Sequence, residues 1–152
     1  MPVVRKIISL FLIFIFAFSL PFTAEAKTKR KKCIQWHPTG DLLSIPFYMD
    51  CNSTKGDLAI ATSDGIFWCP EFAEKLEVAY PGITHFYYVH EYAHYEVGMS
   101  EQAADCWAAK QLAGTCYISI AINHFNDRGD EYIPGYGYMT DRAKTIKECS
   151  NN

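Results

Sequence analysis

Residues 82–112 read GITHFYYVHEYAHYEVGMSEQAADCWAAKQL, and this stretch determines how the rest of the chain is interpreted. The pattern of its first half predicts a helix over residues 84–97. His90 and His94 are four residues apart in that helix. Residues at this spacing lie one above the other on a helical face, so the two imidazoles can point at a single site. The helix is therefore predicted to present a pair of metal ligands.

A second helix is expected directly after the first. Gly98 is a residue type that ends helices, and Ser100 is a good N-cap for a new one. We predict this second helix over residues 101–113. Glu101 and Asp105 are four residues apart in it and share one face. The second helix is therefore expected to bring two carboxylates towards the histidine pair.

Two imidazoles and a carboxylate suit zinc, which takes neutral imidazole nitrogens and carboxylate oxygens in tetrahedral sites. We expect His90, His94 and Glu101 to bind Zn²⁺ and to leave a fourth position for water. Glu91 follows the first ligand and reaches the rim of the same face, where it can act as the general base. Asp105 is expected to accept the free N–H of one histidine and so to set its tautomer.

The two motifs together resemble those of a known class of enzymes. His-Glu-x-x-His at 90–94 followed by Glu-x-x-x-Asp at 101–105 is similar to the gluzincin pattern. The form EQAADCWA (101–108) looks like the E-x-x-A-D-x-x-A segment of the group that includes the HtpX-like and CAAX-prenyl proteases and their small soluble bacterial relatives. The resemblance covers residues 82–112 well and the flanks loosely. It implies a small zincin-like domain, a zinc cofactor and hydrolysis of peptide bonds in a peptide or protein substrate.

Hydrolysis also needs a donor for the oxyanion that forms at the substrate carbonyl. His124, Tyr136 and Tyr138 lie in or beside a late polar loop and carry suitable groups, and His124 is the first choice. Soluble relatives of the resembled group often close with a segment carrying one arginine, which Arg142 resembles. An arginine of that kind could anchor a carboxylate near the site, but the ordinary expectation for Arg142 is a place on the surface of the last helix.

The start of the chain reads as a secretory signal. Two basic residues precede an apolar run over residues 7–22, and an Ala-Glu-Ala cleavage site follows. The run is shorter than a membrane span of about 20 residues, so we expect no stable span after cleavage; an uncleaved N-terminal anchor stays open as the alternative. The chain is thus predicted to consist of a signal peptide (1–26), a basic flexible N-terminus (27–32) and a metallopeptidase-like domain (33–152).

Composition narrows the partners and the compartment. The net charge of −3 argues against nucleic acid as the main partner. Six cysteines in an exported chain predict three disulfides, whose pairing stays open, although the segment from Cys33 to Cys51 is a candidate for closure by its own bridge. We expect a secreted or periplasmic protein that is a monomer.

The flanking segments predict an α+β fold that is mainly helical, with an N-terminal β-hairpin or small antiparallel sheet and disulfide staples. The pattern of residues 58–69 predicts a β-hairpin around an Asp-Gly turn. One of its strands is a candidate to hold a substrate backbone, as the resemblance implies, and a simple covering hairpin is the alternative. Further helices are expected from Pro70 and over residues 138–149, with Thr140 or Asp141 as the last N-cap. Residues 117–125 fit a helix or a strand, and a helix is the first choice.

A different class of function fits the same features. A non-catalytic exported domain could use zinc or its disulfides only to staple a small fold, and its surface would then bind a partner. A peptidase-like inhibitor or toxin is a further alternative. A structural metal site has no need of a general base, so Glu91 favours the enzyme.

Overall fold

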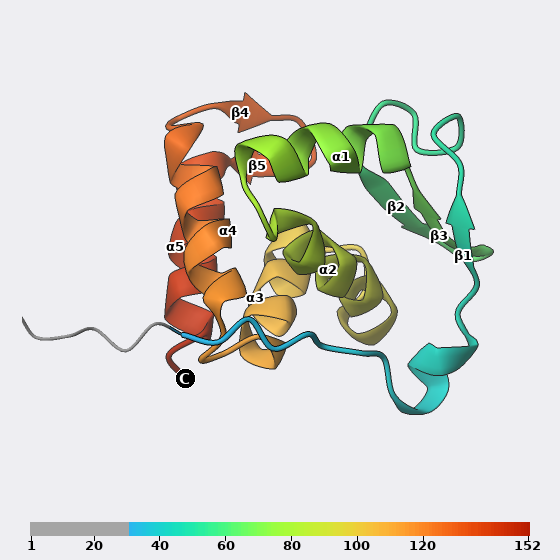
Figure 1. The fold of residues 1–152 in the computed structure, drawn as a ribbon, viewed down its shortest axis with the longest axis horizontal. Coiled ribbons are helices and arrows are strands. Elements are labelled where there is room, and N and C mark those ends of the chain that lie inside the picture. The colour runs from blue at the N-terminus through green and yellow to red at the C-terminus, as the bar shows by residue number, and fades with distance from the viewer. Residues whose placement is uncertain (1–30) are drawn as a thin grey trace, which may run out of the picture.

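The computed structural model describes residues 31–152. The predicted signal peptide and residues 27–30 of the basic segment lie outside the described residues. Within residues 31–152 the fold is α+β, as the sequence predicts, with five α-helices and sheets of three and two strands (Figure 1). The elements in chain order are η1 (Gly40–Ser44), β1 (Phe47–Met49), β2 (Ala59–Thr62), β3 (Gly65–Trp68), α1 (Pro70–Ala79), α2 (Ile83–Val97), α3 (Glu101–Gln111), α4 (Cys116–Asp127), β4 (Tyr132–Ile133), β5 (Gly137–Tyr138) and α5 (Met139–Cys149).

The N-terminal sheet has the strand order β1-β3-β2, so that β2 is one of its edges. Strands β2 and β3 form the predicted antiparallel hairpin, with Thr62 opposite Gly65 across the turn. Strand β1 pairs parallel to β3, which makes the sheet mixed rather than purely antiparallel. A side chain at Gly65 would lie 2.5 Å from the carbonyl oxygen of Pro46, so glycine allows the close approach of β1.

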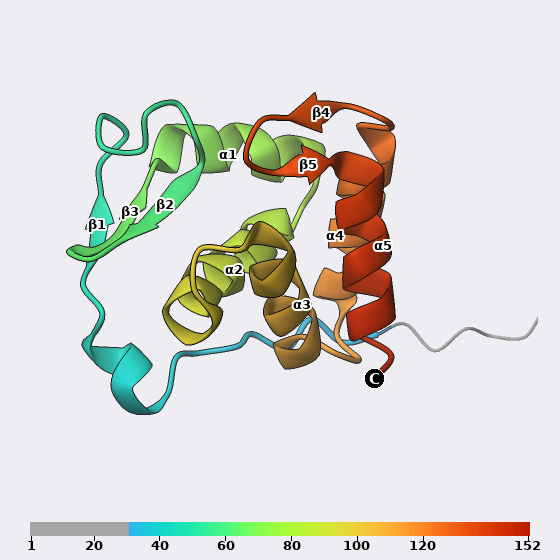
Figure 2. The same cartoon turned by 180° about the vertical axis from the view of Figure 1, so that it is seen from behind.

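Helix α2 is the centre of the fold. Figures 1 and 2 show it between the sheet on one side and helices α3, α4 and α5 on the other, with α1 running along one end. The main hydrophobic cluster joins α2 to α3, α4 and α5; its fully buried members on α2 are Ile83, Phe86 and Val89. Ala104 and Ala108 are also fully buried, and these small side chains let α3 lie close to α2.

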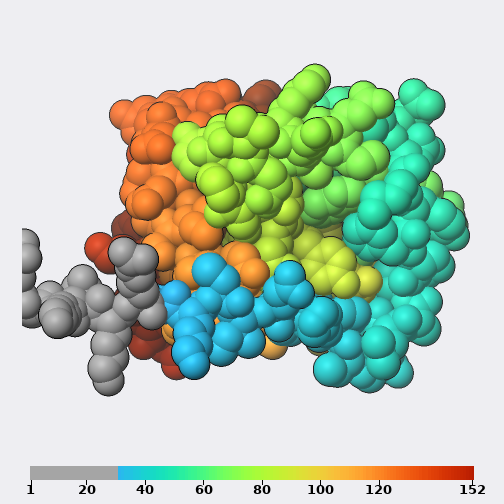
Figure 3. All heavy atoms as spheres, in the orientation of Figure 1, coloured from blue at the N-terminus to red at the C-terminus, as the bar shows by residue number. Residues whose placement is uncertain are grey.

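Three disulfides are present, as the cysteine count predicts, and they indicate an oxidising environment outside the cytosol. The expectation that Cys33 and Cys51 close their own segment is wrong. Instead Cys33 pairs with a cysteine 83 residues later, because the segment that follows Cys33 crosses the helices on its way to the sheet (Figure 3). The pairs are Cys33–Cys116, Cys51–Cys69 and Cys106–Cys149.

Two details near the C-terminus differ from the sequence-based expectation. The polar segment before α5 contains the short antiparallel hairpin β4–β5. Helix α5 begins at Met139, and its N-cap residue Tyr138 makes no side-chain capping bond. Thr140 and Asp141 therefore lie inside the first turn, because the fully buried Met139 starts the packed face of the helix earlier.

In residues 31–152, no helix combines the length and the apolar character needed to cross a bilayer.

Candidate metal centre

The start of α2 is held by the end of the preceding helix. The carboxylate of Glu77 on α1 accepts hydrogen bonds from the backbone N–H groups of Gly82 (2.6 Å) and Thr84 (2.9 Å). These N–H groups belong to the first turn of α2, where no intrahelical partner exists. The bonds fix the direction of the helix and hence the face that its histidines present.

The turn between α2 and α3 forms as the sequence predicts. Gly98 ends α2 with a φ of 79°, in the left-handed region that favours glycine. Ser100 is the N-cap of α3, and its side-chain oxygen accepts a hydrogen bond from the N–H of Ala103. This short connection places Glu101 in the first turn of α3, directly opposite the histidine face of α2.

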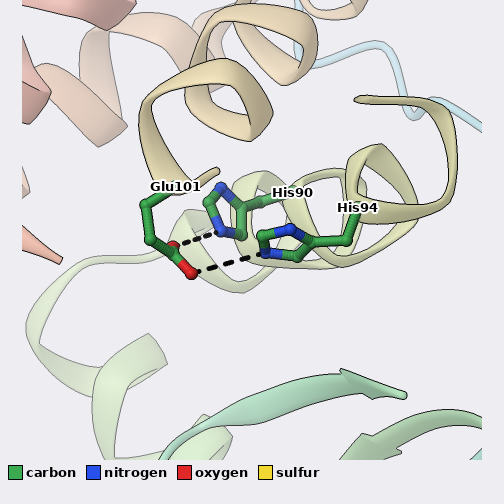
Figure 4. A group of neighbouring side chains, drawn as sticks. All are labelled: His90, His94 and Glu101. Carbon is green, nitrogen blue, oxygen red and sulfur yellow. Dashed lines mark hydrogen bonds and ion pairs between the residues drawn. The ribbon is translucent and has the colours of Figure 1, made fainter. Parts of the chain in front are cut away.

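Three side chains from two helices converge at this point (Figure 4). His90 Nε2 lies 3.0 Å from Glu101 Oε2, and His94 Nε2 lies 3.6 Å from Glu101 Oε1. Both histidines are buried, and Glu101 is partly exposed. The two imidazoles and the carboxylate therefore face one another across a space that solvent reaches from one side.

The outer nitrogen of each ring lies next to an oxygen atom. His94 Nδ1–H donates to the carbonyl oxygen of Gly98 at 3.0 Å. His90 Nδ1 lies 2.9 Å from Asp105 Oδ1, although its N–H direction is not aligned with that oxygen. A proton on each Nδ1 leaves the Nε2 lone pairs free, and these are the atoms that face Glu101.

The arrangement fits a metal ion. One ligand atom from each of His90, His94 and Glu101 lies within 4.8 Å of the others. Zinc in a tetrahedral site has ligands at roughly 2.0–2.1 Å, which separates neighbouring ligand atoms by about 3.3 Å. The separations of 3.0 and 3.6 Å, one to each oxygen of the Glu101 carboxylate, are of similar size. The group can therefore hold a metal ion.

Asp105 is held in place by an arginine from the last helix. Arg142 Nε donates to Asp105 Oδ2 and Arg142 Nη2 to Asp105 Oδ1, both at 2.7 Å. Although burial raises the pKa of Asp105, the guanidinium outweighs it and holds that pKa below the ordinary value. The Arg142 guanidinium also lies 4.4 Å from the centre of the Phe125 ring. Asp105 therefore stays ionised while it contacts His90.

The expectation that Arg142 lies on the surface is wrong. Its side chain is buried, and only 6% of the residue is exposed. The alternative, that Arg142 anchors a carboxylate near the site, is confirmed by its two hydrogen bonds to Asp105. A buried carboxylate needs a cationic or hydrogen-bonding partner, which is the physical reason for the burial of Arg142.

Glu91 is buried beside the ligand group. Burial raises its pKa to about 7, and the charge of Glu101 adds to this effect, whereas His90 and the backbone N–H of Ala61 oppose it. Near neutral pH the carboxyl group of Glu91 therefore exchanges readily between its two protonation states. Such a group is suited to accept and return a proton.

The protonation of the two histidines differs. Burial disfavours the charged form of both. At His90 the carboxylates of Asp105 and Glu101 outweigh this effect and raise the pKa to about 9. At His94 burial dominates and the pKa is lowered. Without a metal, His90 is accordingly the member of the pair that is positively charged at neutral pH, whereas His94 is neutral.

A cavity of about 160 Å³ lies next to His90 and Glu91, and we call it the side cavity. Leu58, Ala59 and Phe72 are among its apolar lining residues. A second hollow, lined by Ala61, Thr62, Ser63, His94, Tyr95 and Met99, lies next to the other histidine. The candidate centre therefore has a recess on each side.

Strand β2 connects these two recesses. It pairs with β3 on one side only. Hydrogen-bonded pairs alternate along an antiparallel ladder, and one such bond joins Cys69 N–H to Leu58 O at 2.8 Å. This register turns the backbone groups of Ala59 and Ala61 towards the free edge. Ala59 lines the side cavity, and Ala61 lines the hollow that His94 also lines.

The three residues considered as oxyanion donors are not equivalent. His124 is buried, its Nε2 lies 3.0 Å from the Tyr87 hydroxyl, and it lines the side cavity together with Glu91. Tyr136 lines the same cavity. Tyr138 is half exposed and lines a different recess, between α3 and α5. Of the three, His124 and Tyr136 border the same cavity as His90 and Glu91.

The structure thus brings together all five residues of the two sequence motifs and adds Arg142 to them. Comparisons of the chain with models of protein families, with curated proteins and with solved structures found no match. The interpretation of this centre consequently depends on the chemistry of its own residues.

Proposed function

We propose that this protein is an exported zinc-dependent metallopeptidase, of the gluzincin type that its two motifs resemble. The observation that carries the proposal is the combination of a ligand group with a buried acid beside it. His90, His94 and Glu101 converge within bonding range of one ion. Glu91, adjacent in sequence and in space, has a pKa raised to about 7 by burial. A metal site that only stabilised the fold would have no use for a buried carboxyl group such as that of Glu91.

Each side chain has a defined role in the proposed reaction. Zinc, when bound by His90, His94 and Glu101, supplies a Lewis acid that polarises the substrate carbonyl and acidifies water. The carboxylate of Glu91 accepts the proton of the attacking water and then returns it to the leaving amine. Asp105, ionised and held by Arg142, keeps the ring of His90 in its ligand tautomer.

The substrate in this proposal is a polypeptide in extended conformation. The free edge of β2 offers the backbone groups of Ala59 and the carbonyl oxygen of Ala61 to an added strand, whereas the N–H of Ala61 bonds to Glu91. Tyr95 reinforces this edge, because its hydroxyl donates to the carbonyl oxygen of Thr62 at 2.7 Å. A peptide bound there passes the face on which Glu91 and the ligands lie. No nucleic acid and no second copy of the chain are part of this proposal.

The donor to the developing oxyanion is assigned to Tyr136, with His124, the first choice from the sequence, as the alternative, because Nε2 of His124 is already bonded to the Tyr87 hydroxyl. Burial, with smaller contributions from Asp57, Glu101 and Glu91, raises the pKa of Tyr136, so its hydroxyl keeps its proton at neutral pH. That hydroxyl is held only by a 3.3 Å bond to Asp57 Oδ2. It is therefore free to donate elsewhere.

The replacement Glu91→Gln tests the proposal. We expect the purified wild-type protein to contain zinc and to cleave an unfolded substrate such as casein, with activity lost to a chelator and restored by zinc. Glu91→Gln should keep its zinc and lose at least ~100-fold in kcat, because the amide cannot accept the proton. The matched control is Glu96→Gln, an exposed glutamate on the same helix. A Glu91→Gln protein that still cleaves at the control rate would exclude Glu91 as the base.

The non-catalytic alternative is supported by one observation. His90 is flanked by the carboxylates of Asp105 and Glu101, so a protonated ring satisfies both without a metal. In that case the group is a structural ion-pair network and the surface serves a binding partner. Metal analysis separates the two candidates, because the alternative predicts a stable protein that neither retains zinc nor gains stability from it.

A further inference from the structure

The side cavity has the size and the walls of a pocket for one aromatic ring. Its apolar lining comes from the sheet, from α1 and from the late hairpin, and consists of Leu58, Ala59, Phe72, Leu76 and Ile133. The volume is about 160 Å³. An apolar protein cavity of about 150 Å³ is known to hold benzene. A six-membered ring therefore fits this space.

Part of the lining of the cavity is polar. Tyr87 and His124, joined by a 3.0 Å hydrogen bond, are both lining residues. Nδ1 of His124 is buried and has no hydrogen-bond partner among residues 31–152. Burial raises the pKa of Tyr87 to about 12, so its hydroxyl stays protonated and can both donate and accept. A buried polar atom without a partner is costly and calls for a water or a ligand group.

The charges around the cavity disfavour an ionic ligand. Two guanidinium groups, those of Arg128 and Arg142, and two carboxyl groups, those of Asp57 and Glu91, line it, so the lining offers no excess charge of one sign to a cationic or an anionic side chain. Each guanidinium is already paired with a carboxylate of this chain, Arg128 with Glu131 at 2.8 Å and Arg142 with Asp105 at 2.7 Å. A substrate carboxylate would have to compete with these pairs. The ligand that best fits these surroundings is therefore a neutral ring with one hydrogen-bonding group.

We propose that the side cavity binds the side chain of the substrate residue that follows the cleaved bond, and that it selects tyrosine over phenylalanine. This inference rests on the proposed function. An added strand pairs most favourably antiparallel to β2. Such a strand runs from the hollow at Ala61 towards the cavity at Ala59, so its later residue reaches the cavity. The ring fills the apolar walls, and the phenol hydroxyl bonds to the polar pair of Tyr87 and His124.

A set of matched peptides tests the selectivity. The peptides differ only at the position after the cleaved bond, which carries Tyr, Phe, Leu or Lys. We expect kcat/KM to be about tenfold higher for Tyr than for Phe, the value of one neutral hydrogen bond, and lowest for Lys. Product sequencing should place Tyr on the amine side of the cleaved bond. Equal rates for Tyr and Phe, or Tyr on the other side, would overturn the assignment.

Two variants link the selectivity to the cavity. Tyr87→Phe removes one hydroxyl from the polar pair and should bring the Tyr-to-Phe ratio close to one. Leu76→Trp fills the cavity and should lower kcat/KM for both aromatic peptides relative to a peptide with Gly at that position. Val78→Trp places the same residue at an exposed position of the same helix and is the matched control. A ratio that is unchanged in Tyr87→Phe contradicts the role of the hydroxyl pair.

A binding experiment separates this inference from the proposed enzyme activity. Metal-free protein is titrated with 4-methylphenol and, in parallel, with toluene, while the NMR signals of the Leu76 and Ile133 methyl groups are followed. We expect 4-methylphenol to bind about tenfold more tightly, and Leu76→Trp to abolish its effect. Selective binding without any peptidase activity would refute the enzyme and keep the cavity as a phenol site. Absence of both, or equal binding of the two compounds, would refute the cavity assignment itself.

Discussion

Helix α2 carries histidine on two different faces, and the two faces have opposite chemical character. On one face, His90 meets the carboxylates of Asp105 and Glu101, which raise its pKa to about 9. On the other face, His85 accepts the backbone N–H of Trp36 at 2.8 Å and packs 4.3 Å from the Tyr117 ring centre. There, burial lowers the pKa of the imidazole. The same residue type is thus a charged centre on one face and a neutral part of the packing on the other.

The comparison shows that the neighbours of a histidine decide its role. The face of His90 receives carboxylates from α3, and α5 supplies Arg142 to hold one of them. The face of His85 receives the N-terminal segment, which brings a backbone donor and the indole of Trp36. A histidine surrounded by carboxylates can bind a cation, whereas one surrounded by rings and a backbone donor contributes only to stability. Five substitutions and one pH dependence test this difference.

The largest expected effect is on stability. Arg142→Met should lower the free energy of unfolding by about 3–5 kcal/mol, because it leaves the buried Asp105 without its guanidinium partner. Urea denaturation measures the loss. Removing both charges in Arg142→Met with Asp105→Leu should recover part of it, since no unpaired charge remains. A single mutant as stable as the wild type would show that the buried pair does not hold the charged face together.

The next largest effect is on zinc affinity, and it is tested by replacing one histidine on each face with alanine. His94→Ala should lower zinc affinity by more than the roughly 100-fold that loss of a supporting residue typically costs, because it removes a ligand. His85→Ala should bind zinc as the wild type does and lose only stability, about 1 kcal/mol for its hydrogen bond. Competition with a chromogenic chelator measures both affinities. Similar losses of zinc affinity in the two variants would contradict the proposed difference between the two faces of α2.

A smaller effect is expected from the contact behind the ligand. Asp105→Asn should weaken zinc binding roughly 10–100-fold while leaving the three ligands in place. The amide keeps the size of the carboxylate but no longer stabilises a proton on Nδ1 of His90 by charge. Calorimetric titration with zinc measures the change. Unchanged affinity in a folded Asp105→Asn protein would show that the contact has no influence on the metal centre.

The smallest effect is a dependence of zinc affinity on pH. The pKa of His90 in the metal-free protein is raised above its ordinary value to about 9, so below pH 9 zinc must displace a proton. Apparent affinity should therefore rise with pH, by at most about tenfold per unit, and level off near pH 9. The raised pKa also stabilises the metal-free protein below pH 6.5, and this contribution is lost as the pH rises through 9. A profile that levels off near pH 6.5 would instead indicate an unperturbed histidine.

Much of the centre could be predicted because its parts are close in sequence. The spacing of His90 and His94, the break at Gly98 and the cap at Ser100 act within one or two helical turns. Hydrogen bonds and steric limits at that range depend on the residues themselves. The hairpin of β2 and β3 was predictable for the same reason, because its turn is two residues long.

Other features depended on contacts between distant segments. Arg142 lies 37 residues after Asp105, and Cys33 pairs with a cysteine 83 residues later. The parallel pairing of β1, the side cavity and the polar pair of Tyr87 and His124 likewise require the packed fold. The amino-acid sequence by itself determined the helices and the ligand spacing, since local geometry follows from local residues. The tertiary structure alone decided which charges are buried together, because burial and pairing arise only when separate elements pack.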